Sequence, residues 1–374
     1  MKDQRILFLG AGKLGSQVLD LMLRVPGKHQ FLVGGRELER LRPRVNLSLL
    51  AALQLGYTPS VSCTLLDLQE VERTADLIAR FSPDLIVCAA TYSPLEERQR
   101  LPPEIEQPLT QAPLGPRLPF HLTSVYQLMQ AIHLSGREQS ITVLNAIYPD
   151  VIHPILAKVG LAPATGIGDL ANNIPALRLS LAWELGIPVE RVDVRLIAAR
   201  WVSYWMSRKN IIGWPLHLTV LVDGEAWTHG LDLERVFARL PVHLKRLGGE
   251  PGLLMTATSA AIVFQAMLSE QTLITHAPGP DGLPGGYPVC VHARRVELAL
   301  PPGLCLEKAK QINEAGLHLD GIERIDEQGT VFFTEEARAV YQNVLGYDCH
   351  SLSLQEVQER MRELRRKYQE KIHK

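Results

Sequence analysis

A glycine-rich hexapeptide near the start of the chain most constrains its fold. Residues 10–15 read Gly-Ala-Gly-Lys-Leu-Gly and directly follow an apolar run at 5–9. Apolar residues then recur at helical spacing over 14–23, and a second apolar run begins at residue 30. A strand, a glycine turn, a helix and a second strand in this order predict a Rossmann-type βαβ unit.

Each glycine has a separate function in such a turn. Gly10 permits the tight turn, Gly12 lets the backbone approach a pyrophosphate, and Gly15 lets the helix pack on the strand. Lys13 and Leu14 begin the helix, whose free N–H groups and positive dipole end favour an anion. The hexapeptide therefore predicts a dinucleotide site, and the alternative is a purely structural turn.

The end of the second strand bears on the choice of cofactor. Proteins that bind NAD place an Asp or Glu there, which accepts from the 2′-hydroxyl of the ribose. This chain has two glycines and Arg36 instead, and three more arginines within the next eight residues. Because a guanidinium pairs with a phosphate, Arg36 favours NADP(H) over NAD, while the later arginines are equally compatible with a solvated helix face.

Strands and helices continue to alternate as far as about residue 150. Strands are expected at 60–66, 85–90 and 141–145, and helices at 44–55, 67–81 and 121–135. This alternation predicts an α/β fold, with a doubly wound parallel sheet in a Rossmann domain at 1–150 and a mixed α+β substrate and dimerisation domain at 151–374.

Polar and small residues at the strand ends are further candidates to contact the cofactor. Asp67 has capping-box spacing with Glu70, and it is also placed to contact an adenine. Ala89, Ala90 and Thr91 stand at the tip of the fourth strand, against the expected ribose and pyrophosphate.

Residues 92–119 interrupt the alternation. The segment contains seven prolines and is therefore not expected to form a regular element. A long irregular loop after the fourth strand of such a sheet lies above its carboxyl edge, where ligands bind.

The second domain is expected to mix helices and strands. Helices are expected at 170–186, 231–246, 253–270, 304–315, 334–345 and 353–371, and strands at 191–199, 216–222 and 288–300, with a hairpin at 322–333. The Gly/Pro-rich segment 276–288 is expected to be either a mobile loop or a close-approach loop. Ser353 and Glu356 have the spacing of a cap for the last helix, whose polarity is typical of a surface or subunit contact.

Three polar residues at or just after the end of the strand at 141–145 are candidates for the chemistry. Asn145 can hold a carboxamide or a substrate oxygen, and Asp150 or His153 can donate or accept a proton. Each also has a structural interpretation, because Pro-Asp is common in turns and a lone histidine is often a core residue.

Two arginines are candidates to bind an anionic group of the substrate. Arg178 lies in a helix that follows Gly168, Asp169, Asn172 and Asn173, and it is either a carboxylate clamp or a surface residue. Arg200 ends a predicted strand and opens an aromatic and basic cluster that runs to Lys209. That cluster is either a substrate wall or a subunit interface.

Composition argues against several classes of protein. A formal net charge of −1 gives no support for nucleic acid or a membrane surface as partner. The five cysteines are scattered and fit neither a disulfide framework nor a zinc site, so a reducing cytoplasm is expected. No group of potential ligands has metal-binding spacing, and no apolar stretch is expected to span a membrane.

The first 90 residues resemble the NADP-binding domain of the saccharopine dehydrogenase-like family. The similarity rests on ILFLGAGKLG, FLVGGR and LLDLQEVERTADLIARFSPDLIVCAA, within about a quarter of the chain. It implies NAD(P)-dependent oxidoreduction of an amino-acid-like or imine substrate by a cytoplasmic homodimer.

The middle of the chain is similar in layout to the lactate and malate dehydrogenases. The turn at 145–150, the helix with Arg178 and the strand ending at Arg200 follow in that family's order. The family's catalytic histidine is missing, because Ala199-Arg200-Trp201 stands in its place.

The sequence favours an NADP(H)-dependent oxidoreductase that acts on a small polar carbonyl, imine or amino-acid-like substrate. A non-catalytic NADP(H)-binding sensor or assembly subunit is the alternative, because no catalytic His–carboxylate pair is recognisable. A short-chain-type reductase is disfavoured, since Tyr126 is followed at Tyr-x-x-x-Lys spacing by Gln130.

Overall fold

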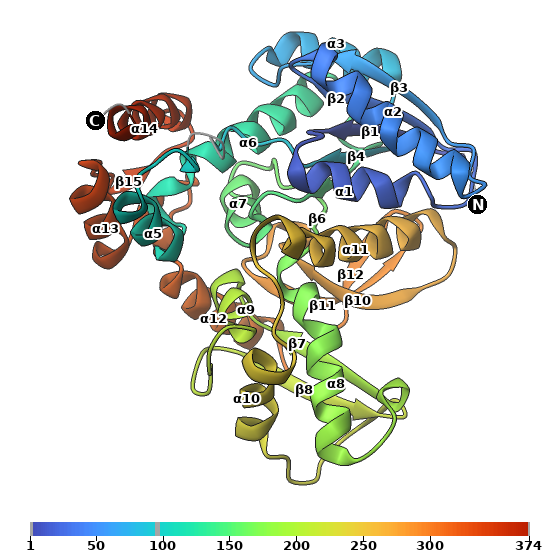
Figure 1. The fold of residues 1–374 in the computed structure, drawn as a ribbon, viewed down its shortest axis with the longest axis vertical. Coiled ribbons are helices and arrows are strands. Elements are labelled where there is room, and N and C mark those ends of the chain that lie inside the picture. The colour runs from blue at the N-terminus through green and yellow to red at the C-terminus, as the bar shows by residue number, and fades with distance from the viewer. Residues whose placement is uncertain (1–2, 94–97, 373–374) are drawn as a thin grey trace.

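The protein, described by a computed structural model over residues 3–93 and 98–372, is built on a six-stranded parallel sheet (Figure 1). The strand order β3-β2-β1-β4-β5-β6 confirms the predicted doubly wound sheet. The strand order reverses between β1 and β4, and sheets of this kind bind ligands at that point. The strands are β1 (Arg5–Leu9), β2 (Gln30–Gly35), β3 (Ser60–Leu65), β4 (Leu85–Cys88), β5 (Thr142–Asn145) and β6 (Thr165–Gly166).

Alternate residues of β1 face opposite helical layers. Leu7 and Leu9 belong to an apolar cluster with two helices, α3 (Val71–Phe81) and α6 (Pro119–Leu134). Ile6 and Phe8 belong to a second cluster with α1 (Lys13–Met22), α2 (Leu38–Gln54) and α11 (Gly249–Leu268). Because both faces of the strand are covered, its sequence is a continuous apolar run instead of an alternating one.

Three small antiparallel sheets and their helices make up the mixed α+β part. The lower lobe in Figure 1 contains β7 (Val192–Ile197), β8 (His217–Val222), β9 (Glu225–Ala226), α8 (Ile174–Leu185) and α10 (Leu233–His243). The sheet that packs on α11 contains β10 (Leu273–Pro278), β11 (Gly286–His292) and β12 (Arg295–Leu298). The C-terminal part contains α12 (Leu306–Leu319), β13 (Ile322–Ile325), β14 (Val331–Phe333), α13 (Glu335–Leu345), β15 (Ser351–Leu352) and α14 (Val357–Ile372).

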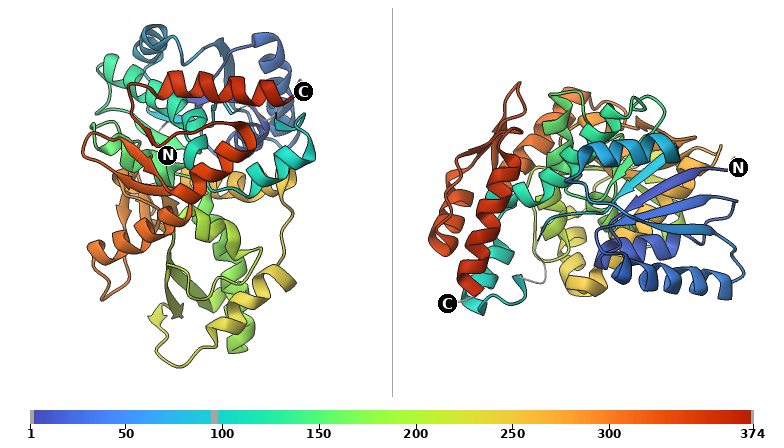
Figure 2. Two further views of the ribbon diagram at one scale, coloured as in Figure 1. Left: turned by 90° about the vertical axis from the view of Figure 1, so that its left-hand side faces the viewer. Right: turned by 90° about the horizontal axis from the view of Figure 1, so that it is seen from above.

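The C-terminal helices pack back onto the first part of the chain. Figure 2 shows α13 and α14 on the side of α5 (Pro103–Gln111) and α6, and contacts join α13 to α5 and α14 to α6. Leu364 and Tyr368 of α14 are fully buried, although most of that helix is polar. The cap predicted for it is present, since Ser353 and Glu356 exchange two backbone-to-side-chain hydrogen bonds of 3.4 Å.

Several expected features of the chain are different in the structure. The segment 92–119, which was not expected to form a regular element, contains α5 and a 3₁₀ turn at Gly115–Arg117. Residues 94–97 of this segment lie outside the described part. Pro103 is tolerated at the first position of α5, because the N–H it lacks would have no partner in the helix. The single strand expected at 288–300 is two strands, β11 and β12, joined by Ala293 and Arg294 with φ of 42° and 65°. No glycine or asparagine marks this turn in the sequence.

The helix α11 is apolar enough, over its 20 residues, to cross a membrane, contrary to the expectation from the sequence. It packs instead against α1 and the sheet of β10–β12. Its buried side chains include Ala257, Ala260, Val263 and Phe264, which join the apolar cluster behind β1. In this structure α11 is therefore a core helix.

Candidate functional site

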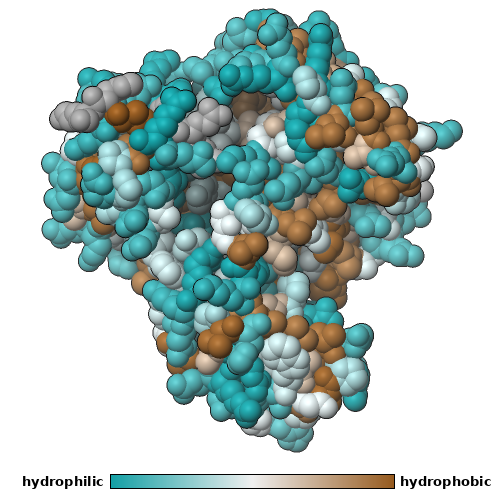
Figure 3. Space-filling view, viewed as in Figure 1, coloured by the Kyte–Doolittle hydropathy of each residue, from teal (hydrophilic) through white to brown (hydrophobic). Residues whose placement is uncertain are grey.

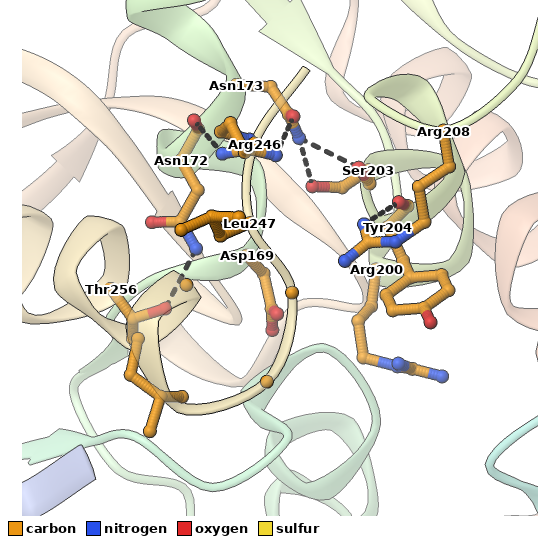
Figure 4. Close-up of a pocket in the computed structure, with 14 residues that line it drawn as sticks. Asp169, Asn172, Asn173, Arg200, Ser203, Tyr204, Arg208, Arg246, Leu247 and Thr256 are labelled. Carbon is orange, nitrogen blue, oxygen red and sulfur yellow. Dashed lines mark hydrogen bonds between the residues drawn. The ribbon is translucent and has the colours of Figure 1, made fainter. Parts of the chain in front are cut away.

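A cleft of about 1010 Å³ runs along the carboxyl edge of the parallel sheet. The glycine loop, the end of β2, the tip of β4 and the segments that follow β5 and β6 line it. Asp169, Arg200, Tyr204 and Thr256 line both this cleft and an adjoining pocket of about 220 Å³ (Figure 4). One continuous space thus connects the predicted phosphate loop to a cluster of charged side chains.

The glycine loop has the geometry predicted for a phosphate-binding turn. Gly10 has a φ of 91°, and a Cβ at Gly15 would lie 1.7 Å from the carbonyl oxygen of Gly10. A Cβ at Gly12 would meet nothing within 4 Å, so the space beside the N-terminus of α1 is open. Lys13 and Leu14 line the cleft, and Lys13 also pairs with Glu250 at the start of α11 at 2.9 Å. These residues fit a pyrophosphate, which needs close approach to the backbone.

Two arginines and one carboxylate line the cleft beyond β2. Arg36 is exposed and lies over the ring of Tyr92, with its guanidinium carbon 5.7 Å from the ring centroid. Glu37 also lines the cleft and forms an ion pair of 3.1 Å with Arg40. Arg44 lies elsewhere, paired with Asp20 at 2.6 Å.

The tip of β4 lines the cleft, but Asp67 does not. Ala89, Ala90 and Thr91 all line the cleft. Asp67 instead accepts the N–H of Gln69 at 3.0 Å, and α3 begins only at residue 71. The predicted capping box with Glu70 is therefore wrong, because Asp67 caps the turn before the helix.

Asn145 and His153 are buried structural residues, contrary to their predicted place in the site. The side chain of Asn145 bonds both backbone groups of Ile147 at 2.9 Å and donates to Nε2 of His153 at 3.0 Å. Nδ1 of His153 then donates to the carbonyl of Gly279 at 2.6 Å. Gly279 approaches so closely that a Cβ there would lie 2.5 Å from Nδ1 of His153. The close-approach loop is shorter than the predicted 276–288, because β10 runs to Pro278 and β11 begins at Gly286.

Acid is expected to destabilise the protein through His153. Burial lowers the pKa of this histidine to about 4, below the value of about 6.5 of an unfolded chain. The unfolded state therefore binds more protons as the pH falls from about 6.5 to about 4, and about 3 kcal/mol of stability is lost in that window. Urea denaturation at both ends of the window should show this loss in the wild type and a smaller one in His153→Gln. Equal losses would contradict the assignment.

Arg178 is also structural. Its Nε donates to the carbonyl of Val192 at 2.6 Å, and Nη2 donates to that of Val189 at 3.2 Å. These bonds fix the start of β7 to α8, and Arg178 lines neither the cleft nor the adjoining pocket. The carboxylate clamp predicted at this position is therefore wrong.

Arg200 lines the cleft and the adjoining pocket, and an ion pair fixes its side chain. It is the first residue of α9 (Arg200–Met206), and its Nε and Nη2 donate to the carboxylate of Asp320, the former at 2.7 Å. Asp320 is fully buried and also accepts the N–H of Leu114 at 2.8 Å. The sequence gives no sign of this pair, because its members are 120 residues apart and no local pattern joins them.

Asp150 lies beneath the cleft and does not line it. It is fully buried in the first turn of α7 (Pro149–Ala157), and its Oδ2 accepts the backbone N–H of Arg200 at 2.6 Å. At this end of the cleft the lining carboxyl group is that of Asp169, in the 3₁₀ turn after β6. In Figure 4, Asp169 lies between Thr256 on one side and Arg200 and Tyr204 on the other.

The adjoining pocket holds two more arginines. Arg246 donates to the carbonyl of Asn172 and to Oδ1 of Asn173, and Arg208 stacks on the ring of Tyr204 at 3.9 Å. Within the described part of the chain neither arginine forms an ion pair with a carboxylate. The pocket therefore offers positive charge to an anion.

Two aromatic residues complete the inner wall of the cleft. The rings of His121 and Tyr148 are in contact, with centroids 4.3 Å apart and planes tilted by 54°, and the guanidinium carbon of Arg200 lies 5.0 Å from the centroid of the Tyr148 ring. Tyr148 has a φ of 39° just before Pro149, a strained position of the kind that gathers at functional sites. Sequence reasoning did not single out either ring, although both lie on segments that follow strands of the sheet.

No family model matches the sequence, and no curated protein matches it either. Solved structures do match over most of the chain. The lactate dehydrogenase of Cryptosporidium parvum, solved with lactic acid and the NAD cofactor, is 14% identical, with a TM-score of 0.57 over 86% of this chain and 99% of that one. The lactate dehydrogenase of Eimeria maxima, solved with NADH and oxamate, is 12% identical, with a TM-score of 0.55 over 85% and 92%.

The malate dehydrogenase of Salinibacter ruber is 15% identical, with a TM-score of 0.54 over 84% of this chain and 95% of that one. The fold is that of the lactate and malate dehydrogenases. The predicted similarity in layout is confirmed at this level, whereas none of these matches supports the resemblance to saccharopine dehydrogenases.

Proposed function

We propose that the protein is a nicotinamide-dependent oxidoreductase that acts on a small polar carbonyl or imine. The continuity of the cleft carries this proposal, because the glycine loop opens into the same space as Asp169 and Arg200. The fold supports it further, since the matched solved structures are those of dehydrogenases.

Each part of the cleft has a place in this function. The glycine loop would hold the pyrophosphate, and the tip of β4 would lie along the ribose. The bound nicotinamide would supply or accept a hydride. The chain itself would orient the substrate against the wall formed by His121 and Tyr148, and Arg200 would fix its polar end.

The proposed substrate carries a negative charge. Arg200, Arg208 and Arg246 all line the pocket beyond the cleft, and the last two form no ion pair within the described part of the chain. A carboxylate bound there would satisfy donors that the protein leaves partly unused. The volume of about 220 Å³ suits a small molecule.

We expect NADPH to bind more tightly than NADH. Arg36 lines the cleft where the 2′-phosphate would lie, and a charge-assisted hydrogen bond contributes about 1.5–3 kcal/mol. Replacing Arg36 with alanine should therefore weaken NADPH binding roughly tenfold or more and leave NADH binding nearly unchanged. Fluorescence titration of both cofactors measures this.

Arg44→Ala is the matched control, because Arg44 pairs with Asp20 outside the cleft. NAD is the competing cofactor. Glu37 lines the cleft and can accept from a ribose hydroxyl, and the Eimeria maxima neighbour was solved with NADH. Equal affinities in the wild type, or tighter NADH, would overturn the preference for NADPH.

A non-catalytic cofactor sensor is the second candidate. No histidine paired with a carboxylate lines the cleft in the part of the chain that the structure describes, so the proton relay of a typical dehydrogenase is missing. Oxidation of bound NADPH by a panel of small oxo acids and imines decides between the candidates. Stabilisation by NADPH without any turnover favours the sensor.

The protein is further proposed to form a homodimer. Apolar side chains gather over α2 in Figure 3, where Leu47 and Leu50 are 61% and 62% exposed. Such a patch is typical of a subunit contact. Light scattering gives the molar mass in solution, and Leu50→Glu should halve it.

A further inference from the structure

Two carboxyl groups meet at the floor of the cleft. Asp150 is fully buried, Asp169 lines the cleft, and the two carboxyl groups are near enough to shift each other's pKa. Oδ2 of Asp150 accepts the N–H of Arg200 at 2.6 Å, whereas Oδ1 is buried and has no hydrogen-bond partner among the described residues. Two ionised carboxylates cannot bond to each other, because neither has a hydrogen to donate. A proton shared with Asp169 would satisfy the unpartnered oxygen of Asp150.

We propose that Asp169 is the proton donor of the reduction and that Asp150 is a positioning residue that shares its proton. This inference rests on the proposed function and names a group that could replace the missing histidine. Asp169 reaches the cleft and the substrate pocket alike, so the proton lies where the substrate would bind.

Burial supports one retained proton on the pair, and the charges around it act in opposite directions. Arg200 lowers the pKa of Asp169 and Asp320 raises it, while Arg208 and Arg246 line the pocket beside Asp169. Burial raises the pKa of Asp169 to about 6 and raises that of Asp150 well above its usual range. An acid of this strength is suited to donate a proton near neutral pH.

His121 is the other titratable group on the inner wall, and its surroundings make it a poor acid. Its Nδ1 is 3.0 Å from the hydroxyl oxygen of Thr91, and its Nε2 has no hydrogen-bond partner among the described residues. Burial and the neighbouring guanidinium groups of Arg117 and Arg200 lower the pKa of His121 well below its usual value. The ring is therefore neutral near pH 7 and does not carry the proton of an imidazolium.

The proposed step conserves atoms and charge. The bound nicotinamide would supply a hydride to the substrate carbon and would itself be oxidised, and Asp169 would give its proton to the carbonyl oxygen. A new C–H bond and a new O–H bond would form as the C=O π bond breaks. The pair would then be left as two carboxylates beside Arg200, and it would regain one proton from water in the open cleft.

Asparagine variants test the shared proton directly. Asparagine tolerates the left-handed backbone of Asp169, whose φ is 45°, so Asp169→Asn keeps the local conformation. Asp223→Asn is the matched control, because Asp223 has a φ of 52° in the turn between β8 and β9, outside the cleft. Infrared difference spectroscopy at about pH 6 detects the carbonyl stretch of a protonated carboxyl group.

The wild type and Asp223→Asn should show this band, and Asp169→Asn and Asp150→Asn should both lose it. NADPH affinity should stay within about twofold in Asp169→Asn, while turnover on a substrate of the panel falls by about 10²–10⁴. A band that persists in Asp169→Asn, or full turnover by that variant, overturns the inference. Failure of the wild type to bind NADPH overturns the proposed function instead. In that case the infrared band still shows whether Asp150 and Asp169 share a proton.

Discussion

Replacing Asp320 with alanine is expected to cost about 3–5 kcal/mol of unfolding free energy, because it leaves a buried guanidinium without its counter-ion. Asp320 is fully buried, and the side chain of Arg200, which donates to it twice, is 10% exposed. The same change also removes the acceptor of the Leu114 N–H. Urea or guanidinium denaturation measures the loss.

Asp348→Ala is the control for this prediction. Asp348 pairs with Arg338 in the same part of the chain, but the pair is exposed and such pairs contribute about 0–1 kcal/mol. The double variant Asp320→Leu with Arg200→Met should recover most of the stability, since it removes both buried charges. A loss for Asp320→Ala no larger than that for Asp348→Ala would show that the ion pair does not hold Arg200.

Replacing Gly15 with alanine is expected to destabilise the protein by about 3 kcal/mol or more. The new Cβ would lie 1.7 Å from the carbonyl oxygen of Gly10. Both atoms are attached directly to the backbone, so neither can move aside unless the chain itself moves. The first turn of α1 would have to shift away from β1, which disrupts the phosphate loop. Thermal denaturation and NADPH titration should both register the change.

Gly12→Ala separates this packing effect from an effect on the ligand. A Cβ at Gly12 meets nothing within 4 Å, so this variant should be as stable as the wild type. If Gly15→Ala is as stable as Gly12→Ala, the close contact with Gly10 does not explain why residue 15 is a glycine.

The sequence predicts the parallel sheet well because its signals are local. The apolar run at 5–9, the glycine turn and the next strand each depend on residues that are neighbours in the chain, and the structure has them as predicted. The hairpin at 322–333 and the cap at Ser353 were predictable for the same reason, since spacing alone specifies them.

The floor of the cleft was predicted much less well, because it depends on contacts between distant residues. Asn145, His153 and Arg178 have the right chemistry for a site, but each is bonded to backbone or core partners that only the fold brings near. Conversely, the functional environment of Arg200 comes from Asp320, far along the chain. Residue type and position after a strand do not reveal whether a side chain points into the cleft or into the core.

The most direct test of the account is an NADPH titration of the wild type and of Gly12→Ala, followed by fluorescence or calorimetry. We expect saturable binding of one NADPH per chain to the wild type, and binding at least roughly tenfold weaker to Gly12→Ala at unchanged thermal stability, because the added methyl group occupies the open space where the pyrophosphate approaches α1. Absence of saturable binding, or equal binding by the variant, would contradict the assignment of the glycine loop as the cofactor site.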